Sequence, residues 1–399
     1  MQPGSPTLAI SRKYTQQGTN GVDFLAAMTA LLRERAHLER TLGQDRAPTG
    51  AGSQEQYPGS SSPLDPGMPR SRQSPVPTSI SSGILFRWRG EMSILDTDVG
   101  QCWNRGRQRL GLPESATPLL DQLHLPFVKS LQQWHQRKSA PVVIGLQGCQ
   151  GAGKSTLCEL VVPLAQDLFD LKVAIVALDD VYLPLQQRQQ LAQQRHPLWI
   201  TRGVPGTHDT ELACEIIGAL ADPAGAAATI PHFDKGIDDR LPTTQSSRIT
   251  GPYDVVIFEG WCTGLGACAE FDWETPINDL ERSEDADMVW RKRIRDQLAG
   301  PYQQLFGLFD HLAILKVPSW ETVSLWRGQQ EARLRADRGH DASRSMDAAA
   351  LQRFLDHYER LTRWTIETLP AVADFVADIA EDRSIVSIQT NQKTPGWNL

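Results

Sequence analysis

A glycine-rich segment at residues 148–155, Gly-Cys-Gln-Gly-Ala-Gly-Lys-Ser, limits the fold of this 399-residue chain more than any other feature. It follows an apolar run at 141–146 that is rich in β-branched residues and bounded by proline and glycine, a pattern that predicts a buried strand. Apolar residues at helical spacing come next and predict a helix over 154–168. A strand, a turn with the pattern GxxxxGK(S/T) and a helix together predict a site for the phosphates of a nucleoside triphosphate.

The chemistry of phosphate binding suggests roles within this loop. Glycines let backbone N–H groups approach phosphate oxygens, and the positive end of the helix dipole adds to the attraction. We expect Lys154 to reach the β- and γ-phosphates of ATP and the Ser155 hydroxyl to hold Mg²⁺. The alternative is a glycine turn that opens a helix and binds no ligand. The residues expected at the nucleotide are Gly148, Gly151, Ala152, Gly153, Lys154, Ser155 and Thr156.

Further apolar segments alternate with helical patterns along the chain. Short β-branched runs predict strands at 172–178, 254–258, 312–317 and 373–379, and periodic apolar residues predict helices at 210–220 and 321–335. Strands that are continuously apolar and separated by helices form parallel sheets covered on both faces. We therefore predict a three-layer α/β fold in which helices flank a parallel central sheet.

The first 83 residues differ from the rest in composition. Residues 43–83 are rich in Pro, Ser and Gly, so they cannot bury enough apolar surface to offset the entropy lost on ordering. Apolar residues between 24 and 38 predict a short amphipathic helix, which either docks on the main body or a partner or is a local helical tail. We predict an N-terminal extension over 1–83 and a main domain over 84–399 that is helical up to about residue 138.

Composition argues against several classes of protein. The net charge is −7 and there is no long basic run, which disfavours general nucleic-acid binding. No uninterrupted apolar run approaches the ~18 residues of a membrane span. The six cysteines form no CxxC pair and the N-terminus lacks the pattern of a secretory signal, so we expect reduced thiols in a cytoplasmic protein.

Three carboxylates follow predicted strands. Asp179 and Asp180 end the second strand and Glu259 ends the third, at the sheet edge where open α/β proteins bind their ligands. One member of the aspartate pair can accept the proton of an attacking hydroxyl group, as kinases require, although a helix cap or turn also explains the pair. Glu259 is placed to order Mg²⁺ directly or through water. The guanine motif NKxD of GTPases does not occur.

Five motifs follow one another along the chain: GCQGAGKST, LDDVYL, RGVPGTHD, PHFDKGIDDR and VVIFEGW. Their order resembles that in the phosphoribulokinase, uridine kinase and pantothenate kinase superfamily, and within it the plant and cyanobacterial type of D-glycerate 3-kinase. The resemblance covers residues 141–383 approximately, and the GTHD and EGW elements are its most discriminating parts. It implies a P-loop NTPase fold with a helical lid region, ATP and Mg²⁺ as cofactors, and a small hydroxylated acid as substrate.

The resemblance also implies roles for single residues. Asp179 takes the position of the catalytic base, and Asp180 helps to orient Mg²⁺ or the hydroxyl group. Arg327 matches a lid arginine that covers the γ-phosphate on closure, or else it lies on the polar face of an amphipathic helix.

The segment that resembles the acceptor site contains several polar residues. Arg202 and His208 suit a small carboxylate, because a bidentate guanidinium matches that planar anion. Asp209 has the alternative role of capping the helix that starts at Thr210. The residues assigned to the acceptor are Arg202, Thr207, His208, Asp209, Lys235 and Arg240.

The sequence therefore predicts transfer of the γ-phosphoryl group of ATP to D-glycerate, which gives 3-phosphoglycerate. The catalytic residues would be Lys154, Asp179, Asp180 and Glu259, with Ser155 and Glu259 at the metal. Another kinase of the superfamily, with a pantothenate or nucleoside acceptor, is one alternative, and an ATP-binding regulatory protein without kinase activity is another. The expected partner is a small-molecule substrate rather than nucleic acid or a membrane.

Overall fold

A computed structural model of the chain describes residues 98–138, 140–267, 271–338 and 346–391. All of these residues belong to one unit, Met92–Leu399. The predicted extension over 1–83, with its helix and linker, lies outside the described residues and stays a prediction.

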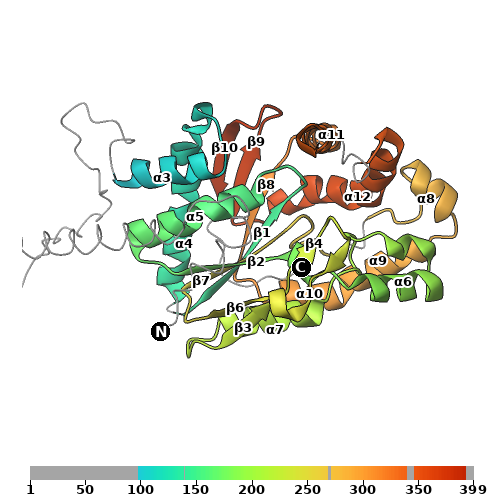
Figure 1. Cartoon of the computed structure of the whole chain (residues 1–399), viewed down its shortest axis with the longest axis horizontal. Coiled ribbons are helices and arrows are strands. Elements are labelled where there is room, and N and C mark those ends of the chain that lie inside the picture. Colours follow the sequence, from blue (N-terminus) through green and yellow to red (C-terminus); the bar gives the residue numbers. More distant parts are fainter. Residues whose placement is uncertain (1–97, 139, 268–270, 339–345, 392–399) are drawn as a thin grey trace, which may run out of the picture. The chain divides into compact units, whose positions relative to one another are not determined.

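A six-stranded sheet forms the centre of this unit (Figure 1), with the strand order β10-β9-β8-β1-β7-β2. Every neighbouring pair is parallel except β9–β10, which is antiparallel. The predicted α/β fold with a parallel central sheet is therefore confirmed, except that the edge strand β10 runs antiparallel to its neighbour. The strands are β1 (Val142–Gly148), β2 (Val173–Ala177), β7 (Val255–Gly260), β8 (His311–Lys316), β9 (Phe375–Ile379) and β10 (Ile385–Thr390).

Burial explains why five of these strands stand out in the sequence and β10 does not. β1 and β7 are buried along their whole length, which requires continuous apolar runs. β10 is an edge strand that is half exposed, and its Val386 has 68% of its surface in contact with solvent. Only the alternation of apolar and polar residues marks such a strand in a sequence.

Helices cover the sheet. α4 (Leu125–Lys138) and α5 (Lys154–Phe169) pack on each other and contact β1, α3 (Asp98–Arg109) packs on α5, and α7 (Thr210–Leu220) contacts β7. In Figure 1, α3, α4 and α5 form one group and α7 lies below the sheet. α5 and α7 confirm the helices predicted over 154–168 and 210–220, and the helix predicted over 321–335 lies within α11 (Trp320–Arg338).

Three long connections add elements that we do not predict from the sequence. Between β2 and β7 lie α6 (Leu185–Gln194) and two antiparallel ribbons, β3 (Ala227–Ile230) with β6 (Ser247–Thr250) and β4 (Phe233–Asp234) with β5 (Asp239–Arg240). Between β7 and β8 lie α8 (Asp279–Glu284), α9 (Val289–Ala299) and α10 (Pro301–Phe306), and α12 (Ala348–Thr368) precedes β9.

A buried ionic network ties α8 and α9 to α12. The Glu281 carboxylate lies 2.6 Å from Arg360 Nη2 and 3.4 Å from Arg291 Nη1, and Arg291 Nε donates to Asp285 at 2.9 Å. All four side chains are almost fully buried, with two positive and two negative charges. Since an unpaired buried charge costs about 3–5 kcal/mol, the network strongly constrains where α12 lies.

Candidate active site

The glycine-rich loop joins β1 directly to α5. Gly151 and Gly153 have φ angles of 83° and 91°, in the left-handed region that favours glycine. A Cβ atom on Gly151 would also lie 3.0 Å from Cβ of Trp326, which packs against the loop from α11. The backbone N–H groups at the start of α5 have no partner within the helix and are free to bind phosphate oxygens.

Lys154, Ser155 and Glu259 come together at the end of this loop. Lys154 Nζ donates to the Gly148 carbonyl at 2.7 Å and lies 3.9 Å from Glu259 Oε2. Ser155 Oγ donates to Glu259 Oε1 at 2.8 Å. A hydroxyl and a carboxylate oxygen at this separation are hard oxygen ligands of the kind that Mg²⁺ prefers, so the predicted metal pair fits the ion.

Asp179 lies at the same edge of the sheet, because β2 pairs with β7 and Ala177 is in register with Glu259. Its Oδ1 accepts a hydrogen bond from the Tyr182 hydroxyl at 2.9 Å, and its Oδ2 accepts one from Lys235 Nζ at 2.5 Å. Burial alone would favour the neutral acid. The charges of Lys235 and Lys154 and these hydrogen bonds outweigh it and hold the pKa of Asp179 well below its usual range.

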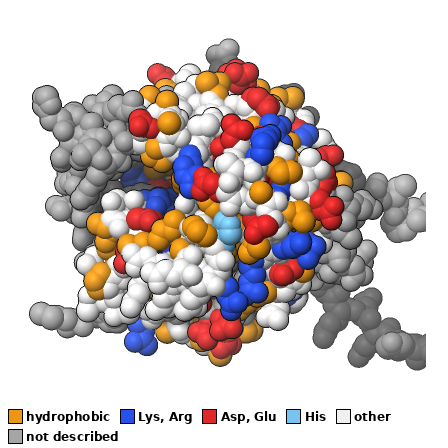
Figure 2. Space-filling model, turned by 90° about the vertical axis from the view of Figure 1, so that its right-hand side faces the viewer, with side chains coloured by type: hydrophobic (Ala, Val, Ile, Leu, Met, Phe, Trp, Pro, Cys, Tyr) orange, Lys and Arg blue, Asp and Glu red, His pale blue; other side chains and the backbone are white. Residues whose placement is uncertain are grey.

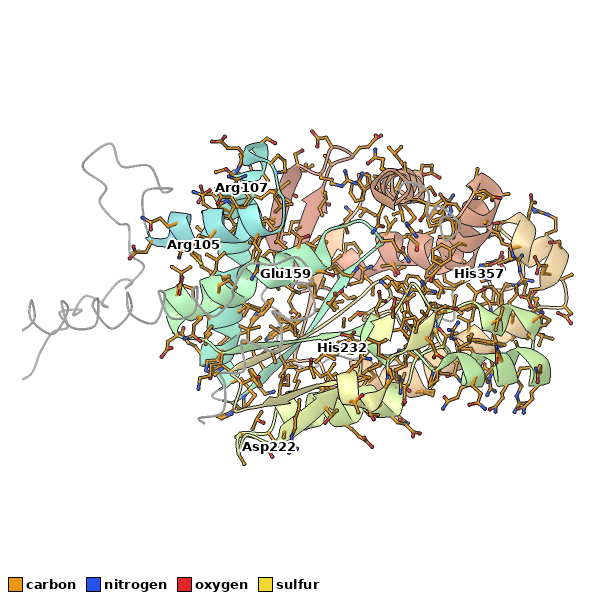
Figure 3. All side chains as sticks on the ribbon, viewed as in Figure 1. Arg105, Arg107, Glu159, Asp222, His232 and His357 are labelled. Carbon is orange, nitrogen blue, oxygen red and sulfur yellow. The ribbon has the colours of Figure 1, made fainter. Side chains whose placement is uncertain are left out.

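Asp180 has a different environment from its neighbour, although both lie in the same 3-10 turn, Leu178–Val181. Asp180 is 6% exposed, and its Oδ1 lies 3.6 Å from Nδ1 of His232. His232 Nε2 in turn is 2.7 Å from Ser247 Oγ. Figure 3 shows His232 in the middle of the molecule, beside the small strands. The more exposed Asp179 is therefore the better placed of the two to meet a substrate.

Arg202 lies on the loop that precedes α7. Its guanidinium forms an ion pair with Asp238 on the β4–β5 turn and stands over the Phe233 ring, with 5.5 Å from Cζ to the ring centroid. Tyr358 on α12 holds the same loop, because its hydroxyl donates to the Arg202 carbonyl at 2.8 Å. The cation is thus fixed near the sheet edge by contacts from two distant segments.

Thr207 and Asp209 shape this loop from within. Thr207 is fully buried, and its hydroxyl donates to the Val204 carbonyl at 2.8 Å and accepts from the Gly203 N–H at 2.9 Å. Asp209 caps α7 by accepting from the Leu212 N–H at 3.1 Å, so the capping role is confirmed. The hydroxyl of Thr207 and one carboxylate oxygen of Asp209 are therefore already occupied.

His208 is stacked on Tyr182, with ring centroids 4.6 Å apart and planes 24° apart. Its Nδ1 lies 2.5 Å from the hydroxyl oxygen of Tyr302 on α10. Burial lowers the pKa of His208 to about 3, although the Asp179 carboxylate favours the charged form. His208 is therefore neutral at physiological pH.

The remaining predicted cations differ in their contacts. Lys235 is bound to Asp179, as described above. Arg240 donates to the Tyr182 carbonyl at 2.8 and 3.1 Å and approaches Asp209 at 3.5 Å, so it braces the loop. Arg327 on α11 forms an ion pair with Glu331 at 3.1 Å. Its contacts in the described structure do not reach the glycine-rich loop, and its function as a lid residue stays a prediction.

Several residues that line this region are not among those predicted from the sequence. Among those with direct contacts to predicted site residues are Tyr182, His232, Phe233, Asp238, Tyr302 and Tyr358. His232 and Asp238 lie inside the PHFDKGIDDR motif, which marks the segment but not these side chains. Tyr302 and Tyr358 are about 100 and 150 residues away in sequence, and nothing in their local sequence marks them.

One other cluster of potential metal ligands occurs among the described residues. His196, Asp285 and Asp287 bring one ligand atom each to within 4.8 Å of one another. The Asp285 carboxylate, however, already accepts from the Trp290 N–H at 2.7 Å and from Arg291 Nε at 2.9 Å. Both oxygens of the Asp285 carboxylate already accept hydrogen bonds, so we do not propose a metal at this cluster.

The face of the unit seen in Figure 2 has acidic and basic side chains interspersed with apolar ones, and one histidine near its centre. Among the described helices, none has the length and apolar character needed to cross a lipid bilayer.

Known proteins and structures are similar to this chain, among them the following three. The uncharacterized kinase mug58 of Schizosaccharomyces pombe is 31% identical over 248 residues, which are 58% of this chain and 83% of that protein. The chloroplastic D-glycerate 3-kinase of Arabidopsis thaliana is 27% identical over 205 residues, which are 49% of this chain and 42% of that protein. The structure of D-glycerate 3-kinase from Cryptococcus neoformans matches with a TM-score of 0.55 and 26% identity, over 67% of this chain and 97% of that one. No protein-family model matches.

Proposed function

Because the chain belongs to the glycerate 3-kinase-type P-loop kinases, it is an ATP-dependent phosphotransferase that acts on a small molecule, and we propose D-glycerate as its acceptor. The product would be 3-phosphoglycerate. The observation that carries the proposal is the juxtaposition of Asp179, bound by Lys235, with the Ser155–Glu259 pair at the end of the phosphate-binding loop.

ATP would bind with its phosphates against the loop from Gly148 to Ser155. Lys154 now donates to the Gly148 carbonyl, and a small rotation of its long side chain would bring the ammonium group to the β- and γ-phosphates. Ser155 and Glu259 would hold Mg²⁺, which when bound supplies positive charge beside the phosphate oxygens. The positive dipole end of α5 adds to the binding of the nucleotide.

Asp179 would act as the general base toward the acceptor hydroxyl. It must be ionised to accept a proton, and the low pKa keeps it ionised. A low pKa also makes a weak base, so the carboxylate serves mainly to orient the hydroxyl and takes its proton late in the transfer. Lys235 now donates to Asp179 Oδ2. When the acceptor hydroxyl binds to that carboxylate, the ammonium group of Lys235 would shift toward the phosphoryl group that is transferred.

The carboxylate of the acceptor would bind between Arg202 and His208. Arg202 brings a permanent positive charge, and it would share its guanidinium between Asp238 and the substrate. His208 is neutral and would donate a hydrogen bond rather than a charge. Thr207, Asp209 and Arg240 would act indirectly by keeping the loop in shape.

The test is release of ADP from Mg·ATP by the full chain, without acceptor and then with D-glycerate, L-glycerate, pantothenate, uridine and ribulose 5-phosphate in turn. Strong stimulation by D-glycerate alone is the expected result, and NMR of the product would show the phosphoryl group on the 3-hydroxyl. Stimulation by pantothenate or uridine would replace D-glycerate by one of the alternative acceptors. ATP binding without stimulation by any compound would favour the regulatory alternative.

Arg202→Lys tests the carboxylate site. It keeps the charge but loses the bidentate geometry, so KM for D-glycerate should rise about tenfold or more while KM for ATP stays constant. Arg248→Lys, on the exposed face of β6, is the matched control and should change neither constant. Equal KM values for D-glycerate in Arg202→Lys and the wild type would show that Arg202 does not bind the acceptor.

The cytoplasmic location stays a prediction.

A further inference from the structure

One end of the His208 imidazole is left without a hydrogen-bond partner by the described residues. This end is the Nε2 atom, which is buried. The side chain as a whole is only 5% exposed. Buried polar atoms in native proteins are almost always paired, so an orphan of this kind beside a predicted substrate site needs an explanation.

The other end of the imidazole is held by Tyr302. The Tyr302 hydroxyl oxygen accepts from the Gly206 N–H at 3.1 Å and lies 2.5 Å from His208 Nδ1. Tyr302 is fully buried, and burial raises its pKa well above the usual value, so the phenol keeps its proton. That proton has one acceptor among the described contacts of Tyr302, which is the Nδ1 lone pair of His208.

The alternative arrangement satisfies fewer groups. If His208 carried its proton on Nδ1 and donated to Tyr302, the phenol proton would be buried without an acceptor and Nε2 would be an orphan acceptor. With the proton on Nε2, the Tyr302 hydroxyl donates to the Nδ1 lone pair of His208. Only the Nε2–H group then has no partner among the described residues. The tyrosine thus selects the tautomer, since the hydrogen bond at one ring nitrogen decides which nitrogen is protonated.

We infer that Tyr302 is a positioning residue that fixes His208 as the Nε2–H tautomer, so that a buried N–H donor is held ready for the carboxylate of the acceptor. This inference rests on the proposed function, and it adds to it a residue from α10 and the direction of the hydrogen bond. Tyr182 extends the arrangement, because its ring stacks on His208 while its hydroxyl donates to Asp179. Tyr182 therefore contacts both His208, the proposed donor to the substrate carboxylate, and Asp179, the proposed general base.

A neutral donor suits a site that already contains Arg202. A charged imidazolium would have to be desolvated at a buried position, whereas a neutral N–H adds a directional hydrogen bond without a second charge. The neutral N–H can then donate a charge-assisted hydrogen bond to a carboxylate such as that of D-glycerate.

The tautomer can be measured without any substrate. In the full chain labelled with ¹⁵N-histidine, long-range proton–nitrogen NMR at pH 7 should show the His208 proton on Nε2, with the signal assigned by its loss in His208→Gln. A proton on Nδ1 would overturn the inference. Because no acceptor is present, this result does not depend on whether D-glycerate is the substrate.

Amide variants test the donor by activity. The amide N–H of Gln reaches the Nε2 position, whereas that of Asn reaches only the Nδ1 position. His208→Asn should therefore raise KM for D-glycerate by about 10–100-fold, the worth of a hydrogen bond to a charged group, and His208→Gln by clearly less. An Asn variant that binds D-glycerate better than the Gln variant would contradict the inference.

Tyr302→Phe separates positioning from packing. It keeps the ring but removes the hydroxyl, so KM for D-glycerate should rise several-fold with KM for ATP nearly unchanged, and the melting temperature should fall because the Gly206 N–H and His208 Nδ1 lose a buried partner. Tyr253→Phe, another buried tyrosine outside the site, is the matched control and should leave KM unaltered. Equal effects of the two variants would reduce Tyr302 to a packing residue. If D-glycerate does not stimulate ADP release by the wild-type enzyme, the proposed function is refuted. The NMR experiment would still show which nitrogen of His208 carries the proton.

Discussion

Replacement of Asp179 by asparagine removes the carboxylate and keeps the shape of the side chain. In the structure Asp179 accepts from two donors, the Tyr182 hydroxyl at 2.9 Å and Lys235 Nζ at 2.5 Å. An amide can still accept from one of them but cannot take a proton from the substrate. A positioned general base contributes about 10²–10⁴-fold to a rate, which corresponds to about 3–5 kcal/mol, so we expect kcat to fall by that factor.

The fold and the nucleotide site should survive this change. Lys235 is 59% exposed and Asp179 39%, so their ion pair stabilises the protein by at most about 1 kcal/mol. The contacts among Lys154, Ser155 and Glu259 do not involve Asp179, so the affinity for ATP should remain within about twofold of the wild type.

A coupled assay of ADP release at saturating D-glycerate, with a parallel measurement of ATP binding, checks this prediction. Asp222→Asn is the matched control, since Asp222 lies in a surface turn at the lower edge of Figure 3 and its carboxylate accepts from the Ala224 N–H, which an amide oxygen can also do. A kcat for Asp179→Asn within about fivefold of the wild type would refute Asp179 as the base. The same test on Asp180 would then follow.

Three further predictions concern stability and pH. Gly203→Ala should lower the free energy of unfolding by about 2–4 kcal/mol in a urea titration, because φ is +127° and the new Cβ would lie 1.8 Å from the Tyr358 hydroxyl oxygen. Lys235→Met should raise the pKa of Asp179, so the acid limb of the kcat/KM profile should move to higher pH than in the wild type. The free energy of unfolding should fall as the pH drops below about 6.5, because the unfolded chain then protonates histidines that stay neutral in the folded state. Burial lowers the pKa values of three histidines, His124, His208 and His357. Together they can lower the free energy of unfolding by at most about 4 kcal/mol per pH unit near pH 5.

Each of these predictions has a result that would contradict it. Gly218→Ala, in α7 where a Cβ meets nothing within 4 Å, should be neutral or stabilising, and a loss equal to that of Gly203→Ala would show that neither strain nor the clash matters. An acid limb that stays in place in Lys235→Met would show that Lys235 does not control Asp179. A free energy of unfolding that is constant from pH 7 to pH 4.5 would show that these histidines are protonated in the folded protein.

Local signals in the sequence predict much of the fold and of the nucleotide site. A buried parallel strand must be apolar along its length, so the strands from residue 141 to 379 are visible as runs of apolar letters. The phosphate-binding loop is contiguous in the chain, because a turn between one strand and one helix forms it completely. The capping alternative for Asp209 could also be stated in advance, since an N-cap depends on three or four consecutive residues.

The acceptor site depends on contacts that no local pattern encodes. Tyr302 meets His208, and Tyr358 meets Arg202, across 94 and 156 residues of chain. The sequence determines which side chains are available and which of them lie at the ends of strands. Only the packing of α10 and α12 against the loop before α7 decides which nitrogen of His208 carries its proton and where Arg202 is held, because a hydrogen bond depends on distance in space and not on separation along the chain.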